Sequence, residues 1–83
     1  MIKMNSEIKY IAVVTGYGKP LFVGRDKLNP KGFSAHEDSA NALKAVDLNT
    51  AELVAQEYVK DNEIDNDSVK IYPVKVSYEV EEL

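Results

Sequence analysis

Apolar and polar residues alternate near the end of the chain, between residues 69 and 80. A period of two predicts a β-strand whose register is tightly specified, because a slip by one residue would move its whole apolar face into water. Val69 and Ile71 lie on the opposite phase from the rest, which predicts a bulge or bend near Tyr72 and Pro73. The residues on one face are Tyr72, Val74, Val76, Tyr78 and Val80, opposite Pro73, Lys75, Ser77 and Glu79.

A long strand needs partners, and the first third of the chain supplies a β-hairpin. Residues 8–15 and 21–25 are rich in β-branched and apolar side chains, and the residues between them include Gly16, Gly18 and Pro20. Both glycines can adopt positive φ, and Pro20 cannot donate to a ladder, so the loop is predicted near residues 16–20. Residues 1–7 are predicted to form a flexible N-terminal segment.

A helix is predicted between residues 50 and 61, because Asn49 and Glu52 have the spacing of a capping box. Its apolar residues recur at helical spacing, which predicts one buried stripe. Residues 26–38 show no periodicity and predict an irregular connection. The segment of residues 39–48 is ambiguous, because its alanines favour a helix while residues 43–48 alternate as a short third strand, which is the interpretation we choose. The predicted stripe consists of Ala51, Val54, Ala55, Tyr58 and Val59.

These elements predict an α+β fold in ββ-β-α-β order, with a small antiparallel sheet of three to four strands and one main helix packed on one face. Eighty-three residues suffice for one compact domain, spanning residues 1–83. A lone hairpin is marginally stable in water, so the terminal strand must join it and the helix must cover the sheet.

Composition narrows the function classes. The chain has no cysteine, which excludes disulfides, thiolate catalysis and cysteine-based zinc sites. Its net charge of -4 disfavours binding to nucleic acid or to anionic lipid. The longest apolar run, residues 11–14, is far shorter than a membrane span, and no secretion signal is evident. We therefore expect a cytoplasmic protein.

The segment from Ala42 to Ala55, ALKAVDLNTAELVA, leads from the predicted third strand into the capped helix, and a Lys- and Val-rich strand follows. In this order of elements the chain resembles small phage- and prophage-encoded proteins of unknown function, over about its last two-thirds. The resemblance implies an accessory protein that acts in a host cytoplasm by binding, for example as an inhibitor of a host or defence protein, and it carries no catalytic residues.

No segment has the complete pattern of a catalytic or metal site. Residues 34–39 hold two serines, the single histidine and two acids, but neighbours on one short loop rarely form a hydrolase triad. We therefore interpret them as a polar loop or first helical turn. Residues 61–67 begin like a calcium loop, yet Asn66 replaces the turn glycine and Tyr72 the bidentate glutamate. We predict no catalytic residue, no metal and no cofactor.

The leading hypothesis is therefore a non-enzymatic protein-binding module that forms a homodimer. Ile11 and Val13 lie on the sheet face opposite the predicted helix and need a cover, which makes them the candidate dimer face. Residues 34–83 hold twelve acidic and four basic side chains, so a basic partner would be attracted there. The candidate partner surface is the densest acidic part, formed by Glu63, Asp65 and Asp67.

Two alternatives stay open. The first is a small-ligand or nucleotide-binding module, in which Tyr17 stacks on a base and Lys19 pairs with phosphate. Its candidate ligand loop is Gly16, Tyr17, Gly18 and Lys19. The second is an acidic mimic of nucleic acid, although the predicted helix directs only Glu52 and Glu57 outward and Lys60 follows them.

Overall fold

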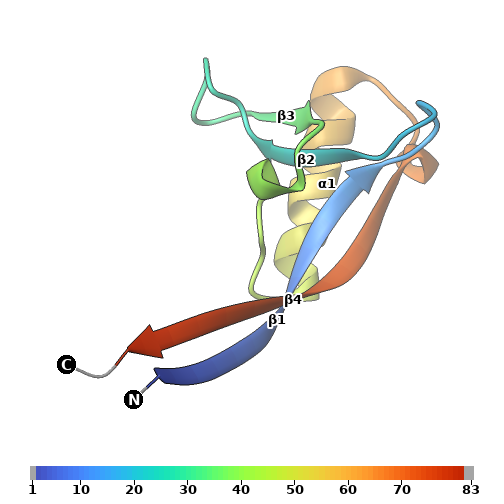
Figure 1. Ribbon diagram of the computed structural model, residues 1–83. Helices are drawn as coiled ribbons and strands as arrows, with labels where there is room; N and C mark the ends of the chain where they lie inside the picture. Colours follow the sequence, from blue (N-terminus) through green and yellow to red (C-terminus); the bar gives the residue numbers. More distant parts are fainter. Residues whose placement is uncertain (1, 82–83) are drawn as a thin grey trace.

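The computed structural model describes the backbone of residues 2–81 and the side chains of residues 5–78. It confirms the α+β class: a four-stranded antiparallel sheet in the spatial order β3-β2-β1-β4 packs against one main helix (Figure 1). The elements are β1 (Ile2–Val14), β2 (Leu21–Arg25), β3 (Phe33–His36), the 3₁₀ turn η1 (Ser39–Asn41), α1 (Leu48–Asn62), the 3₁₀ turn η2 (Asn66–Ser68) and β4 (Val69–Glu81).

The third strand is not where the sequence predicts it. Strand β3 lies inside the segment predicted to be irregular, because Phe33 and Ala35 pack against the core under α1. Residues 43–48 instead fill the place where β2 and β1 separate. The Leu43 N–H donates to the Val23 carbonyl at 3.0 Å, and Ala45 forms a single antiparallel bridge with Tyr10. The prediction of a strand at residues 43–48 is therefore wrong, because the segment forms only this one bridge. Ala45 is buried and Leu43 is half-buried, whereas Val46 and Leu48 are 67% and 48% exposed.

Helix α1 confirms four members of the predicted stripe, because Ala51, Val54, Ala55 and Tyr58 are buried, and the fifth, Val59, is half-buried. It begins two residues before the predicted start. Its N-cap is Asp47 rather than Asn49, and the Asp47 Oδ1 accepts a hydrogen bond from the Thr50 backbone N–H at 2.7 Å.

The Asp47 cap predicts a specific pH dependence. Hydrogen bonds from the backbone N–H and then the side chain of Thr50 lower the pKa of Asp47 below its ordinary 3.8. A carboxyl group with a lowered pKa stabilises the fold above its ordinary pKa, and this contribution is lost as the pH falls through the folded value. We expect Asp47→Asn, which keeps a capping oxygen, to lose less thermal stability than the parent between about pH 5 and about pH 2. Circular dichroism melts at both pH values test this, and equal losses would contradict it.

Strands β1 and β4 pair without interruption over thirteen residues each, from Ile2 opposite Glu81 to Val14 opposite Val69. The predicted bulge is therefore wrong. The apolar residues change phase along β4 because the strand buries one face in its first part and the other face further on. Val69 and Ile71 pack on the side of α1, whereas Val74 packs on the opposite side of the sheet.

That opposite side carries its own small core. Ile11 and Val13 are each 6% exposed and pack with Ala42, which follows η1, and with Phe22 and Val74. We call this side of the sheet the η1 face and the other side the α1 face. A covering segment of the same chain thus buries Ile11 and Val13, so these two residues are not available as the predicted dimer face.

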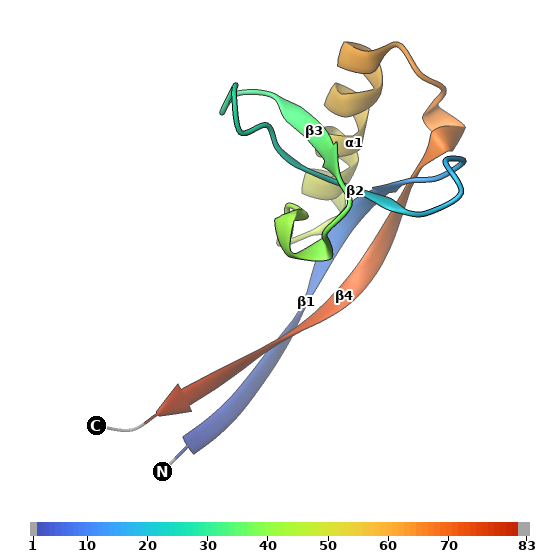
Figure 2. The ribbon, with the colours of Figure 1, turned by 45° about the horizontal axis from the view of Figure 1, so that its top comes forward.

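Beyond the Tyr10–Ala45 bridge, β1 and β4 leave the body as a twisted two-stranded ribbon that ends at the pair Ile2 and Glu81 (Figure 1, Figure 2). We call this ribbon, residues 2–9 and 74–81, the arm. It makes the molecule 49 Å long and 25 Å across in both other directions. Residues 2–7, predicted to be flexible, lie in β1, and Met1 lies outside the described residues.

Candidate functional site

Two of the predicted sites lie at the same end of the molecule, opposite the arm. The loop between β1 and β2 and the turn between α1 and β4 are adjacent in both views (Figure 1, Figure 2). A direct contact joins them, because the Ser68 carbonyl accepts hydrogen bonds from the Thr15 N–H at 2.7 Å and the Thr15 Oγ1 at 3.3 Å. The sequence did not indicate this proximity, since 53 residues separate the two partners.

The turn that carries Glu63, Asp65 and Asp67, here called the acidic turn, is held at both ends. Glu63 caps α1 in the left-handed conformation, with φ 52° and ψ 46°. Ile64 follows it, donates its N–H to the Val59 carbonyl at 3.3 Å and packs against the core. The Asp65 carbonyl accepts from the Ser68 N–H at 3.0 Å and closes η2. The backbone of the turn is therefore fixed while its carboxylates point into solvent.

The acidic turn is an exposed cluster of carboxylates. Glu63, Asp65 and Asp67 are all exposed. Among residues 5–78, ion pairs join Lys9 to Glu7 and Lys19 to Glu37, so the three carboxylates are unpaired in that range. Within the same residues, no group of three or more acidic or histidine side chains is close enough to hold a metal ion. The turn can therefore attract positive charge at a distance, because its field is not cancelled locally.

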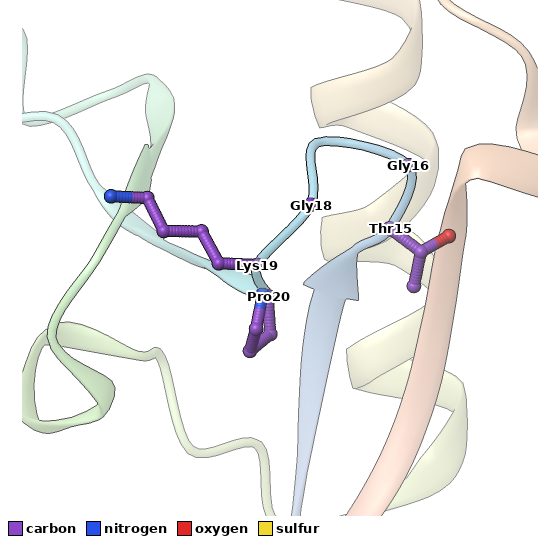
Figure 3. A pocket seen from close by; sticks show the side chains of 5 residues that line it. All are labelled: Thr15, Gly16, Gly18, Lys19 and Pro20. Carbon is purple, nitrogen blue, oxygen red and sulfur yellow. The ribbon is translucent and has the colours of Figure 1, made fainter.

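The candidate ligand loop has the backbone that its glycines predict. Gly16 and Gly18 have φ values of 97° and 79°, which side-chain-bearing residues rarely adopt. A shallow, open hollow runs along the loop and is lined by Thr15, Gly16, Gly18, Lys19 and Pro20 (Figure 3).

Lys19 is not directed at this hollow. Its side chain extends away from Thr15 and Gly16 (Figure 3), and its Nζ lies 2.6 Å from the Glu37 Oε1. Tyr17 is 60% exposed. The pKa of Tyr58, near the end of α1, is raised first by the burial of Tyr58 and second by the charge interaction with Tyr17. A phosphate at this loop would have to compete with Glu37 for the ammonium group, so the geometry favours a hairpin turn over an anion cradle.

Ser34 and His36 come together, but their contact does not form a nucleophile and base pair. The Ser34 Oγ lies 3.1 Å from the His36 Nε2, which also lies 3.0 Å from the Arg25 carbonyl oxygen. A carbonyl oxygen only accepts, so the Nε2 must carry the proton and cannot take one from Ser34. Glu37 pairs with Lys19, and Asp38 caps η1 by accepting from the Ala40 N–H. The cluster therefore ties β3 to β2.

The arm carries a surface that the sequence analysis did not single out as a site. Tyr72, Val74, Val76 and Tyr78 lie on the η1 face, and Tyr72 and Tyr78 are 46% and 43% exposed. We call these four residues the arm stripe; three of them lie in the arm, and Tyr72 lies just before it, opposite Ile11. The sequence did contain a signal for this surface, which is the change of apolar phase at Tyr72. It marks the point where the apolar residues of β4 move from the α1 face to the η1 face.

Polar groups flank the arm stripe on the neighbouring strand β1. Lys9 Nζ lies 3.7 Å from Glu7 Oε2, and both residues share the η1 face because they pair with Val74 and Val76. A hydrogen bond to the Glu7 carboxylate raises the pKa of the Tyr78 hydroxyl. The face of the arm therefore consists of an apolar stripe beside one acidic and one basic group.

Comparison of the chain with protein-family models, with curated proteins and with solved structures yields no match. The helices found in residues 2–81 are too short or too polar to cross a bilayer.

Proposed function

We propose that this protein is a small non-enzymatic binding module whose acidic turn attracts a basic partner protein in the cytoplasm. The observation that carries the proposal is the fixed backbone of the turn together with its three exposed, unpaired carboxylates. A preorganised charged surface accelerates encounter with a partner of opposite sign without an ordering cost at the moment of binding. The resemblance to phage-encoded proteins extends the proposal to a host or defence protein as the partner.

A protein partner is favoured over the two alternatives by the charges around the turn. A nucleotide would bring negative charge to the end that already carries Glu63, Asp65 and Asp67, and Lys19 is engaged by Glu37. A mimic of nucleic acid would need a long stripe of negative charge, whereas this cluster is confined to one turn and Lys60 precedes it.

Capture from the native host cytoplasm, followed by binding kinetics of the retained protein, tests the proposal. We expect Asp65→Asn/Asp67→Asn to slow association several-fold at about 0.01 M salt and to leave dissociation nearly unchanged, because exposed rim charges act on encounter. The difference should largely vanish at about 0.15 M salt, where the Debye length is about 8 Å. Asp65 makes no side-chain capping bond, so its replacement leaves the turn intact.

The matched control is Glu52→Gln/Glu57→Gln, which removes two exposed carboxylates from α1 and should slow association less than the turn variant does. If dissociation quickens instead, the turn lies inside the contact rather than at its rim. If neither rate changes, the acidic turn is not the partner surface and the proposal fails. Retention of a small molecule with no protein would favour the loop at Gly16 and Gly18 instead.

A further inference from the structure

The arm has an open side along β1. Strand β4 pairs with the whole arm segment of β1, but β2 pairs with β1 only at Val13 and Val14, and Ala45 only at Tyr10. Within residues 2–81, no strand or backbone hydrogen bond lies on the other side of residues 2–8, which we call the β1 edge. Both views show the arm projecting away from the rest of the chain (Figure 1, Figure 2). A two-stranded ribbon is marginally stable in water, and such an edge is a template for a further strand.

The Tyr10–Ala45 bridge shows which backbone groups the β1 edge offers. The Tyr10 N–H donates to the Ala45 carbonyl at 2.9 Å and the Tyr10 carbonyl accepts from the Ala45 N–H at 2.8 Å, so both Tyr10 groups point away from β4. Alternate residues of a strand direct their backbone groups to the same side, so Ile8, Ser6 and residues 4 and 2 present theirs to the β1 edge. None of these four residues is proline or charged, so the edge lacks the residues that commonly block pairing.

The outer edge of β4 is a poorer route for a partner strand. Pro73 pairs with Tyr10, so its backbone points to the outer edge, since paired antiparallel residues point either toward each other or apart. Proline has no N–H to offer there, and the exposed Lys75 presents its backbone to the same edge. The β1 edge is therefore the side of the arm that is open to a further strand.

We propose that the β1 edge pairs with the β1 edge of a second copy of this chain, so that the two arms form one antiparallel sheet in the order β4-β1-β1-β4. The pairing of identical edges about a two-fold axis is self-complementary, as an isologous dimer requires. It uses neither face of the sheet, so the cover of Ala42 over Ile11 and Val13 stays in place. The β1 edge lies at the other end of the molecule from the acidic turn, so the inference does not depend on the proposed function.

The position of Ala45 limits how far the second strand extends. Ala45 occupies the place beside Tyr10, so pairing between the copies stops at Ile8. After Ala45 the chain bends at Val46 and Asp47 and enters α1, and it forms no backbone hydrogen bond with Ile8. The backbone groups of Ile8 are therefore free for the second copy.

This limit selects the register. The longest pairing of residues 2–8 with themselves has its two-fold axis at Asn5, with Ile8 opposite residue 2 and Ser6 opposite residue 4 of the second copy. A shift toward Tyr10 would meet Ala45, and a shift toward the tip of the arm would lose hydrogen bonds. Each body lies at one end of its arm (Figure 2), so this register places the two bodies at opposite ends of the shared sheet.

Exposed apolar side chains mark the place where the tip of the second arm would lie. Ile8 is 53% exposed, and Val46 and Leu48 are exposed as well. Ile8 lies two residues before Tyr10, and Val46 and Leu48 follow Ala45 closely, so the bridge brings all three to one end of the β1 edge. Gathered exposed apolar residues are typical of an interaction surface, and a second strand beside Ile8 would cover part of this one.

Sedimentation velocity across a concentration series up to about 100 µM tests the dimer, because that limit exceeds typical micromolar dissociation constants. We expect a dimer for the parent protein. Ser6→Pro removes an N–H from the β1 edge but none that β4 uses, and it should raise the dissociation constant at least about tenfold. A parent that is monomeric at about 100 µM overturns the proposal, and so does a Ser6 variant that dimerises as tightly as the parent.

Ser77→Pro is the matched control. Ser77 is the partner of Ser6 in the ladder and is equally exposed, but its backbone points to the outer edge of β4, where Pro73 already lies. It should leave the dissociation constant unchanged. Equal circular dichroism spectra for the two variants and the parent would exclude loss of folding as the cause. A dimer lost in both variants would place the contact elsewhere and overturn the proposal.

Disulfide trapping tests the register without destabilising the arm. The chain has no cysteine, so one introduced thiol gives an unambiguous result. In the proposed register the two copies of Asn5 form a non-hydrogen-bonded pair with Cα atoms about 4.5 Å apart, within the range of about 4.4 to 6.8 Å that a disulfide spans. Mild oxidation of Asn5→Cys should therefore yield a covalent dimer.

Glu7→Cys is the control for the trapping experiment. Glu7 is exposed and lies on the same face of β1 as Asn5, but the two copies of Glu7 would be about 13 Å apart along the strands, at about 3.3 Å per residue. Glu7→Cys should therefore stay without a disulfide under the same conditions. Efficient trapping through Glu7→Cys but not through Asn5→Cys would overturn the proposed register.

Discussion

Replacement of Ala55 by aspartate is expected to unfold a large fraction of the protein at 25 °C. Ala55 is 9% exposed and packs in the core between α1 and the sheet, with Val54 and Tyr58 of the same helix. A carboxylate there loses its hydration and has no partner, which costs about 3 to 5 kcal/mol. A domain of this size has a total stability of roughly 4 to 12 kcal/mol, so the loss is a large part of that stability and can exceed it at the low end of the range. Urea denaturation followed by circular dichroism measures the loss.

Gln56→Asp is the matched control, because Gln56 is the next residue of α1 and is exposed. It introduces the same carboxylate into the same helix but leaves it in water, so its unfolding midpoint should lie close to that of the parent. Equal midpoints for the Ala55 and Gln56 variants would contradict the orientation of α1 on the sheet.

Gly24→Ala is expected to have the second-largest effect. Gly24 is buried in β2, and a methyl group there would overlap the carbonyl oxygen of Asn41 and lie 3.1 Å from the His36 Cδ2. The Asn41 carbonyl belongs to η1, so the backbone of η1 has to move away from the sheet. Overpacking of this kind costs about 1 to 3 kcal/mol, and displacement of η1 also loosens the cover over Ile11 and Val13.

Gly32→Ala provides the control for Gly24. Its new methyl group would meet the Asn29 side-chain Nδ2 at 3.2 Å, and that side chain lies on an exposed loop where it can shift. Urea midpoints should fall for Gly24→Ala and change little for Gly32→Ala. A Gly24 variant as stable as the parent would mean that η1 does not rest on β2.

Local patterns predicted those elements whose periodicity is strong. The stripe from Ala51 to Tyr58 specified the buried side of α1, because only one face of that helix is apolar. The alternation after Tyr72 likewise specified β4. Strand β3 was missed because its four residues are too few to establish a period, and because its polar members Ser34 and His36 bond to each other and to the Arg25 carbonyl.

The candidate surfaces were predictable only in part. The acidic turn was evident from the spacing of Glu63, Asp65 and Asp67, since charge density along a chain needs no tertiary information. Its attachment to the loop between β1 and β2, through Ser68 and Thr15, is not indicated by any local pattern. Similarly, the alternation of Tyr72 to Tyr78 revealed a stripe, but not that it would extend beyond the body.

The sequence by itself determined the α+β class, the inward stripe of α1, the hairpin glycines and the charge of the acidic turn, because each follows from the periodicity, backbone preference or charge of neighbouring residues. Only the tertiary structure decided which faces are covered. The segment around Ala42 buries Ile11 and Val13, and β1 and β4 run past the body as the arm. Such outcomes depend on which distant segments compete for the same apolar surface, and the chain resolves that competition only when it packs.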